Sequence, residues 1–199
     1  MADSTQFSIC SYNCRGYNLI KKRYVEYLLS RSSVLFLQEH WLSENQCALF
    51  DDLSSNCSQY AVSGFSNDEV LMGRPFGGCA IVWRHDVVTN MKRVFIDSRR
   101  IIVVSCEISS VKLLLINVYM PCDTNDSTSS DAFLHEHSLC ETILDNYHDH
   151  EVILGGDFNV DLNSSDYLSH IVGDFITYNN LCRCDVVFPV SNRNTFINE

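Results

Sequence analysis

The chain has 199 residues, and its 14 Lys and Arg residues against 25 Asp and Glu residues give a formal net charge of −11. Hydrophobic residues make up 46% and charged residues 20%, which excludes a disordered chain, while 3 Pro, 8 Gly and no repeat exclude collagen-like and solenoid classes. No apolar run reaches the ~20 residues of a membrane span, and the N-terminus lacks a secretory signal pattern. One intracellular domain over residues 1–199, without a membrane partner, is therefore expected.

The first part of the chain alternates strand and helix patterns. Residues 7–13 alternate like a half-buried strand that ends in a glycine-containing loop. Residues 21–31 carry apolar side chains three to four positions apart, which predicts an amphipathic helix. Residues 34–38 form a short apolar strand directly before Glu39, and Ser43 is placed to cap a short helix that reaches about residue 53.

The middle of the chain predicts an antiparallel hairpin. Residues 77–83 and 101–108 are rich in β-branched and apolar side chains, as strands are. The second of these runs turns through Ser109-Ser110 into another apolar run over residues 112–119. Two strands joined by a two-residue turn form a hairpin.

The last part of the chain predicts a crossover connection. Residues 131–147 match a helix, for which Asp131 is the expected N-cap. Residues 151–156 form an apolar strand that leads into Asp157, and a final helix is expected within residues 166–178. The mixture of strands and helices predicts an α+β fold in which helices cover the sheets, and no composition break marks a domain boundary.

The ten cysteines indicate buried thiols. They include no Cys-x-x-Cys pair, so the paired ligand sets of zinc fingers are missing. Cys79 and Cys106 lie inside apolar runs, where cysteine behaves as a small hydrophobic residue. We expect reduced, structural cysteines.

The acidic balance argues against binding nucleic acid through a broad basic face. Beyond Lys21-Lys22-Arg23 and Arg99-Arg100 there is no strong basic cluster. An acidic protein that acts on phosphates needs bound cations to screen its carboxylates from the substrate.

Polar side chains recur where apolar strands end. Asn13, Glu39 and Tyr119 each end or follow a predicted strand, and Asp157 and Asn159 follow another. Strand ends present side chains on a rigid base. A carboxylate and an amide at one pocket suit Mg²⁺, which polarises a phosphoryl oxygen, while a second carboxylate activates water and a phenol donates to the phosphate.

Each of these residues also has a purely structural explanation. Glu39 could cap a helix or lie in a solvated turn, and Asp157-Phe158-Asn159 could form an Asx turn. Tyr119 could be a half-buried edge tyrosine. The seven histidines are predicted on helix faces or loops and are not expected to be ligands. Spacing alone therefore leaves a metal site as one alternative.

Five segments, taken together and in order, resemble the endonuclease/exonuclease/phosphatase superfamily, which includes deoxyribonuclease I, apurinic endonucleases and inositol polyphosphate phosphatases. They are Ser-Tyr-Asn-Cys-Arg-Gly (11–16), Leu-Phe-Leu-Gln-Glu-His-Trp (35–41), Arg-Pro-Phe-Gly-Gly-Cys-Ala-Ile (74–81), Ile-Asn-Val-Tyr-Met-Pro (116–121) and Leu-Gly-Gly-Asp-Phe-Asn (154–159). The local sequences are most similar to the endonuclease domain of non-LTR (LINE-type) retrotransposons. The resemblance covers about residues 7–196.

The resemblance implies a four-layer α/β/β/α sandwich of two mixed β-sheets with helices outside. It implies that Glu39 is the main Mg²⁺ or Mn²⁺ ligand, with Asn13 beside it near metal and phosphate. Tyr119 would bind the scissile phosphate, Asp157 would orient or deprotonate the attacking water, and Asn159 would stabilise the phosphoryl oxygens. The implied activity is metal-dependent nicking of DNA with a 3′-hydroxyl product.

Two departures from the family pattern change these expectations. Arg15 stands where some members carry an acidic residue. The late Asp-bearing strand and the Ser-Asp-His motif of the family are absent from the 199 residues. The chain is therefore expected to be incomplete at its C-terminus, to lack its last strands, and to be poorly active and prone to aggregate.

Two alternatives stay open. The chain could be an inactive remnant or a non-catalytic binding module with the same fold. Within the superfamily it could instead be a phosphoinositide or sphingolipid phosphodiesterase, although no suitable basic or apolar loop is evident. DNA is the expected partner and a monomer the expected state, with nuclear localisation if the chain belongs to a retroelement.

Overall fold

The computed structural model describes residues 7–122 and 127–187, and the chain divides into two compact units, residues 1–159 and 160–199. In the second unit, Asp166 caps helix α3 (Tyr167–Tyr178), where its side chain accepts a hydrogen bond from the Ser169 N–H at 2.8 Å. A short helix, α4 (Cys184–Val187), follows it. The expectation of one domain over residues 1–199 stays a prediction.

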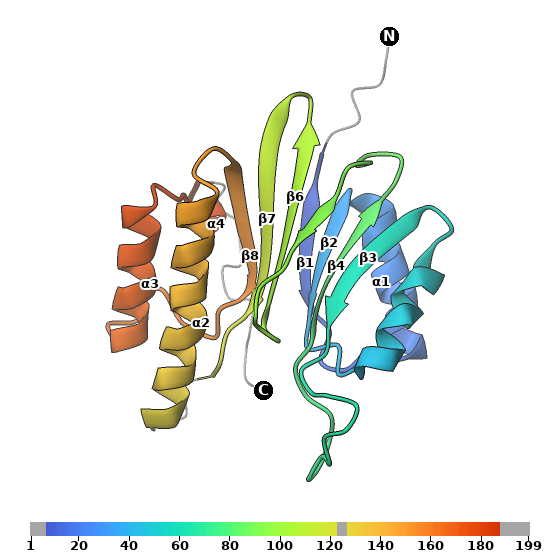
Figure 1. Cartoon of the computed structure of the whole chain (residues 1–199), viewed down its shortest axis with the longest axis horizontal. Coiled ribbons are helices and arrows are strands. Elements are labelled where there is room, and N and C mark those ends of the chain that lie inside the picture. The colour runs from blue at the N-terminus through green and yellow to red at the C-terminus, as the bar shows by residue number, and fades with distance from the viewer. Residues whose placement is uncertain (1–6, 123–126, 188–199) are drawn as a thin grey trace. The chain divides into compact units, whose positions relative to one another are not determined.

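The first unit contains two four-stranded sheets with helices around them (Figure 1). Sheet A has the strand order β1-β2-β4-β3 and sheet B the order β5-β6-β7-β8. Each sheet has one parallel pair, β1 with β2 and β7 with β8, so both sheets are mixed and the predicted α+β class is confirmed. The elements of this unit are β1 (Ile9–Asn13), α1 (Leu19–Arg31), β2 (Val34–Gln38), the 3₁₀ helix η1 (Glu44–Leu53), β3 (Cys57–Val62), β4 (Cys79–Arg84), β5 (Lys92–Val94), β6 (Ile101–Ile108), β7 (Val111–Tyr119), α2 (Ser127–Asn146) and β8 (Glu151–Asp157).

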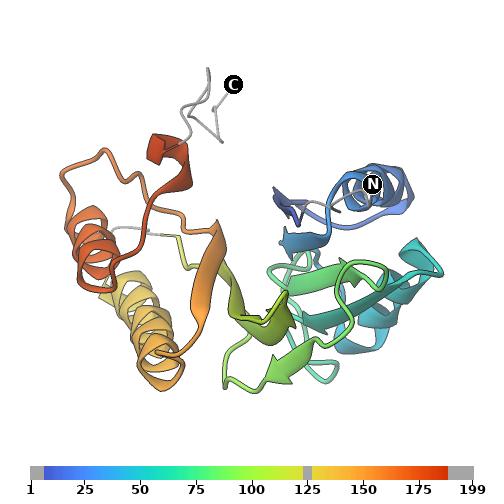
Figure 2. The same cartoon turned by 90° about the horizontal axis from the view of Figure 1, so that it is seen from above.

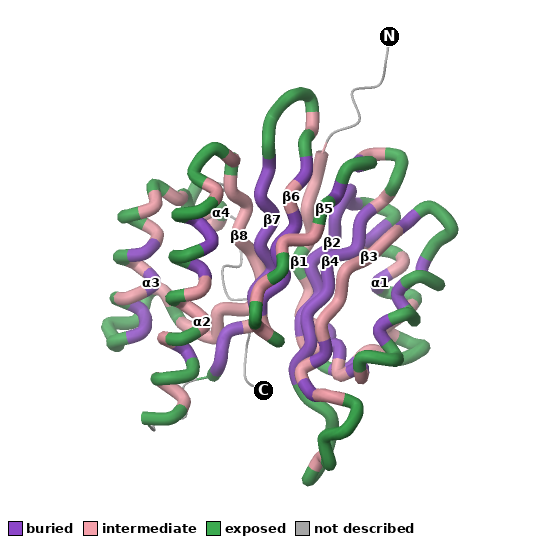
Figure 3. The backbone as a smooth tube through the Cα atoms, viewed as in Figure 1, coloured by how far each residue is buried: buried purple, intermediate pink, exposed green. Residues whose placement is uncertain are grey.

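Strand β2 shows why the unit is layered. All five of its residues are buried (Figure 3), because successive side chains point to opposite faces and both faces are covered. Val34 and Phe36 join the hydrophobic cluster between the sheets. Leu35 and Leu37 join a second cluster with residues of α1 and η1, and Figure 2 shows these helices beside sheet A.

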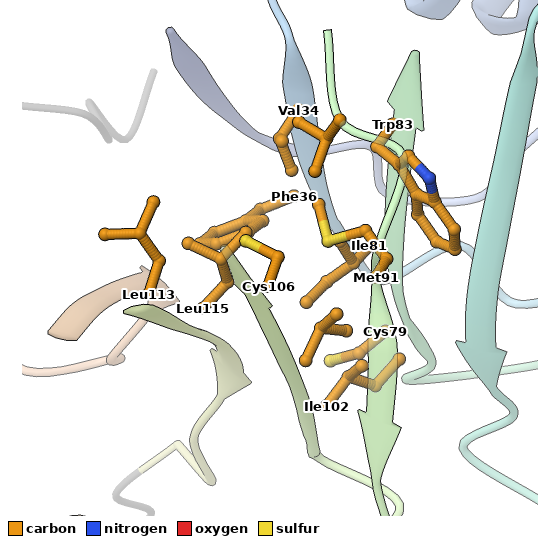
Figure 4. Close-up of a cluster of buried hydrophobic side chains, with 12 residues drawn as sticks. Val34, Phe36, Cys79, Ile81, Trp83, Met91, Ile102, Cys106, Leu113 and Leu115 are labelled. Carbon is orange, nitrogen blue, oxygen red and sulfur yellow. The ribbon is translucent and has the colours of Figure 1, made fainter. Parts of the chain in front are cut away.

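The cluster between the sheets is built from alternate residues of four strands (Figure 4). Phe36 meets Ile81 and Trp83 of β4 from one sheet and Leu115 of β7 from the other within this cluster. At about 25 cal/mol per Å² of apolar surface removed from water, this burial is the dominant stabilising contribution in the unit.

The predicted hairpin is confirmed, because Ser109 and Ser110 connect β6 to β7. Both serines adopt positive φ angles, 51° and 66°, as a type I′ turn requires. Two strands were not predicted. β3 carries mostly half-buried, partly polar residues at a sheet edge, and β5 has three residues, so neither gives a clear alternating pattern.

Two helix starts differ from the predictions. Helix α2 begins at Ser127, so Asp131 lies inside the helix and the prediction that it is the N-cap is wrong. Residues 127–130, the first turn of α2, are all polar, so they show no apolar periodicity that would predict the start of the helix. Helix α1 begins at Leu19, and the Asn18 side chain caps it by accepting from the N–H groups of Ile20 and Lys21 at 3.0 Å.

Most of the cysteines are buried, as the composition indicates. All ten cysteines are free thiols, and six of them are buried, as expected for structural cysteines. Within the described part of the chain, no helix is long and apolar enough to span a membrane.

Candidate active site

The carboxyl ends of four strands supply the candidate site. Asn13 ends β1, Tyr119 ends β7 and Asp157 ends β8, while Glu39 follows β2 directly. Because β1 runs parallel to β2 and β7 parallel to β8, each pair delivers its polar groups to the same edge of its sheet. In the strand orders of the described residues, β1 and β8 are the terminal strands of the two sheets.

The Asn13 amide joins two carboxylates from different sheets. Its Nδ2 donates to Glu39 Oε1 at 2.7 Å and to Asp157 Oδ2 at 2.7 Å. Its Oδ1 accepts from the backbone N–H of Arg15 at 3.2 Å. The amide therefore holds Glu39 of sheet A and Asp157 of sheet B at a fixed separation.

The backbone around Glu39 is strained. Glu39 has a φ of 52°, a left-handed conformation that non-glycine residues seldom adopt. The Gly16 N–H donates to the Glu39 carbonyl at 2.7 Å and holds this corner. Strain of this kind costs on the order of 1–3 kcal/mol and occurs preferentially at functional sites.

Asp157 is positioned by close approach of β7 and β8. Gly156, directly before it, has a φ of 132°, and a Cβ there would lie 2.0 Å from the Val118 carbonyl oxygen. Asp157 Oδ1 accepts from the Asn159 N–H at 3.1 Å, and Asn159 Nδ2 donates to the Met120 carbonyl at 2.7 Å. The Asx turn considered from the sequence is thus present, and it orients the carboxylate of Asp157.

Tyr119 is held by an arginine. The Arg100 guanidinium lies 5.1 Å from the centroid of the Tyr119 ring, and its Nη1 donates to the Tyr119 carbonyl at 3.2 Å. Burial is the largest cause of a raised pKa at the Tyr119 phenol, and the negative charges of Glu39 and Asp157 raise this pKa further. The phenol is therefore neutral at physiological pH and acts as a hydrogen-bond donor.

Cys122 lies in the same electrostatic environment. Burial, followed by the charges of Asp157 and Glu39, raises the pKa of its thiol. The two carboxylates thus act on both Tyr119 and Cys122, which indicates that these groups share one acidic end of the unit.

A layer of neutral polar groups lies beneath the carboxylates. Gln38 Nε2 of β2 donates to Asn117 Oδ1 of β7 at 2.6 Å and to Ser11 Oγ of β1 at 3.2 Å. Asn117 Nδ2 donates to the carbonyls of Leu37 and Ala80, each at 2.9 Å. We call Gln38 and Asn117 the amide layer, and it ties sheet A to sheet B directly below the site, while the exposed Ser11 bonds to its edge.

His40, next to Glu39, is fully buried and structural. Its Nε2 donates to the Val62 carbonyl at 3.0 Å and its Nδ1 accepts from the Leu42 N–H at 3.0 Å, which defines a neutral ring. Burial lowers the pKa of His40 to about 4. Both ring nitrogens of His40 are therefore occupied by hydrogen bonds within the fold.

The donor set fits a hard divalent cation. Mg²⁺ is held through one or two carboxylates and keeps several waters, and Glu39 and Asp157 provide two carboxylates bridged by one amide. No cluster of three His, Cys, Asp or Glu side chains occurs in residues 7–122 and 127–187. Asn13 would ligate through Oδ1, which would have to replace Nδ2 by rotation about χ2.

The structure brings the five predicted residues together. The Asn13 amide hydrogen-bonds to Glu39 and Asp157, and the Asp157 carboxylate accepts from the Asn159 N–H. The charges of Glu39 and Asp157 raise the pKa of Tyr119. Sequence reasoning missed Arg100 as the partner of Tyr119 and missed the amide layer. The signal for the amide layer was present, because Asn117 interrupts an apolar strand and an amide there needs buried partners.

Paired carboxylates, amides and a phenol at the strand ends of two mixed sheets can hold a divalent cation beside a phosphate ester. The sequence matches the Endonuclease/Exonuclease/phosphatase family over residues 10–189, and the chain belongs to this family. Its members are phosphoesterase and nuclease hydrolases that generally use divalent metal ions. A search of curated proteins gives no match.

Solved structures share the fold at low sequence identity. The 3′ phosphatase NExo from Neisseria, bound to a product DNA hairpin, is 22% identical with a TM-score of 0.56, and the match covers 78% of this chain and 58% of that one. A humanized D. rerio TDP2 is 20% identical with a TM-score of 0.59, over 84% and 70% of the two chains. An AP endonuclease from Archaeoglobus fulgidus is 16% identical with a TM-score of 0.55, over 78% and 58%. The chain thus spans less than two thirds of the first and third of these proteins.

Proposed function

We propose that the chain carries a metal-dependent phosphodiesterase site that nicks DNA, as the endonuclease of a LINE-type retroelement does. The observation that supports this most strongly is the Asn13 amide, which holds the carboxylates of Glu39 and Asp157 together from two sheets. A purely structural turn would need neither a cross-sheet carboxylate pair nor the strained φ of Glu39. The DNA hairpin bound by NExo supports DNA as the substrate class.

The residues divide the reaction between them. Glu39, with Asp157 beside it, would hold Mg²⁺ or Mn²⁺, and the bound ion would neutralise charge on the phosphoryl group. Asp157, oriented by Asn159, takes a proton from the attacking water. Tyr119 donates its phenol proton in a hydrogen bond to a phosphoryl oxygen. Asn159 uses one amide hydrogen on Met120 and offers the other to the phosphate.

A cavity beside the site gives room for the flanking part of a substrate. Its volume is about 370 Å³, and Arg99 and Arg100 line it together with Phe76 and Glu136. Arg100 links this cavity to Tyr119, since it contacts the ring and carbonyl of that residue. Asp97 and Glu136 balance the two arginines of the lining, and Arg99 also pairs with Glu69, so Arg100 is the group that would favour a phosphate next to the site.

Nicking of supercoiled plasmid with Mg²⁺ or Mn²⁺ tests the proposal. We expect open circles with 3′-hydroxyl ends, formed slowly in line with the low activity expected from the sequence, and loss of nicking in Glu39→Gln and Asp157→Asn. Glu151→Gln is the matched control, because Glu151 lies at the other end of the strand that carries Asp157. Equal nicking by all variants would contradict the proposed site.

Metal titration separates an inactive remnant from a nuclease. We expect Mn²⁺ to bind the chain in calorimetry, with the heat lost in Glu39→Gln and retained in Glu151→Gln. Identical heats in Glu39→Gln and Glu151→Gln would show that Glu39 does not bind the metal.

A further inference from the structure

Trp41 is held at the corner that also carries Glu39. Its φ is 60°, again in the left-handed region, and its N–H donates to the Gly77 carbonyl at 3.0 Å. This bond joins the corner to residues 63–78, the segment that connects β3 to β4. The two residues Glu39 and Trp41 are therefore positioned by the same short, strained piece of backbone.

Gly16 makes room for the indole. A Cβ at Gly16 would lie 2.4 Å from Cε3 of the Trp41 ring, so only glycine lets the ring pack there. Trp41 nevertheless stays half-buried and belongs to neither hydrophobic cluster described above. By contrast, Trp83 is 6% exposed and lies in the core (Figure 4). Trp41 is thus fixed in place but presented at the surface.

Arg74 lies over this indole without a carboxylate partner. Its Cζ is 5.0 Å from the centroid of the Trp41 ring. Arg84, Arg99 and Arg183 form ion pairs, whereas Arg74 forms none within the described ranges. In a chain of net charge −11, Arg74 thus presents a positive charge that can contact an anion. Arg31 is stacked as well, over Tyr27, but Arg74 lies over a residue only two positions from Glu39.

The segment that carries Arg74 extends from the site end of sheet A. Gln38, the residue before Glu39, pairs with Cys79, at which this segment ends (Figures 1 and 3). Its side chains Val70 and Met72 are 84% and 99% exposed. Exposed apolar side chains beside a stacked arginine match the surfaces that separate or stack on nucleobases.

We propose that Trp41 and Arg74 bind the nucleotide next to the scissile phosphate, and that the preferred substrate is DNA in which this nucleotide is unpaired. The base stacks on the Trp41–Arg74 pair, and the guanidinium donates to the adjoining backbone phosphate. Stacking accepts any base, so the surface selects strand structure and not sequence. This inference rests on the proposed phosphodiesterase site and specifies its substrate.

Tryptophan fluorescence tests the stacking without cleavage. The chain contains two tryptophans, and only the surface residue can stack on DNA, since Trp83 is buried. Titration with a short single-stranded oligonucleotide in EDTA should quench the emission. Trp41→Leu should lose the quenching and bind at least about ten-fold more weakly, while Trp41→Phe should retain most of the affinity. Unchanged affinity in Trp41→Leu would overturn the proposal.

Arginine variants test the phosphate contact. Arg74→Ala should weaken binding and reduce the slope of log K against log salt by about 0.7, the value for one phosphate of a single strand. Arg31→Ala is the matched control, because Arg31 lies 5.7 Å over Tyr27 at the far end of α1. Equal salt slopes for Arg74→Ala and the unmodified chain would exclude a phosphate contact.

Cleavage of paired oligonucleotides separates this inference from the proposed function. Trp41→Leu should cut a bubble substrate at least about ten-fold more slowly and a perfect duplex less than about two-fold more slowly. Equal losses on both substrates would assign Trp41 a structural role and overturn the inference. If the unmodified chain shows quenching but never cleaves, the proposed function fails and the binding surface stands.

Discussion

Two polar regions connect the sheets, and they differ in charge and burial. The outer region, which we call the rim, consists of Asn13, Glu39, Tyr119 and Asp157 at the strand ends. Asn13, Glu39 and Asp157 are half-buried, and two of them are carboxylates. Deeper in the unit, Gln38 and Asn117 are 1% and 0% exposed, and both are neutral amides. Both regions cross the gap between sheet A and sheet B, yet the charged groups lie only in the outer one.

The difference follows from solvation. A buried carboxylate loses several kcal/mol of hydration, on the order of magnitude that would unfold a domain, unless a cation or donors compensate. A buried amide needs only its hydrogen bonds, and Asn117 makes them to Gln38, Leu37 and Ala80. If the rim serves the proposed chemistry and the amide layer serves the fold, substitutions in the two regions should separate activity from stability.

The largest expected effect is on activity at the rim. Glu39→Gln removes a charge that a cation requires but keeps an acceptor for the Asn13 amide. We expect the nicking rate to fall by roughly a thousand-fold, which corresponds to several kcal/mol of lost transition-state stabilisation. The free energy of unfolding without metal should change by no more than about 1 kcal/mol, because the site is solvated. Nicking assays and urea melts measure the two quantities.

A rim variant whose free energy of unfolding falls together with its nicking rate would contradict the separation of activity from stability. Glu151→Gln, on the same strand as Asp157, should change neither quantity measurably.

The next effect is on stability in the amide layer. Asn117→Leu removes the partner of Gln38 Nε2 and takes the side-chain donor from the carbonyls of Leu37 and Ala80, which keep their backbone bonds in the β2–β4 pair. At roughly 1–3 kcal/mol for the buried Gln38 donor that loses this partner, we expect a loss of about 2 kcal/mol. Urea denaturation measures it, with the exposed Asn146→Leu as control. A loss below about 1 kcal/mol would show that the amide layer is dispensable.

Sequence reasoning succeeded where a pattern is local. The run Val34 to Gln38 predicted a buried strand with its true bounds, and the Ser109-Ser110 turn predicted the hairpin. It failed at β3 and at the first turn of α2, where polar residues carry no period and tertiary packing decides the structure.

The sequence predicted which residues form the candidate site but not which of them hydrogen-bond to one another. Short motifs singled out Asn13, Glu39 and Asp157, yet nothing local states that one amide bonds both carboxylates. Such bonds join residues up to 144 positions apart and depend on how the sheets pack. The same holds for Arg100 on Tyr119, which packing alone places there.

His40 extends the comparison to pH, because it adjoins Glu39 in sequence but is buried like the amide layer. Its pKa is lowered to about 4 by burial, against 6.5 in the unfolded chain. The unfolded state therefore binds a proton that the native state does not, so stability falls as pH drops from 6.5 to 4. This contribution is at most about 3 kcal/mol and stops changing below pH 4.

Urea melts in EDTA between pH 4 and 7 measure the contribution of His40. In His40→Gln, the contribution of residue 40 to the slope of unfolding free energy against pH should vanish. An unchanged pH dependence in that variant would place the titration elsewhere.

The smallest effect is expected at Tyr119, which lies at the rim but is uncharged. Tyr119→Phe removes one hydrogen bond to the phosphate, so we expect about a ten-fold loss in kcat with little change in stability. Because burial and the charge of Glu39 keep the phenol protonated, the pH–rate profile from 6 to 9 should keep its shape in the variant. Loss of an alkaline limb in Tyr119→Phe would instead show that the phenol titrates during turnover. Tyr119 would then belong with the ionised groups of the rim.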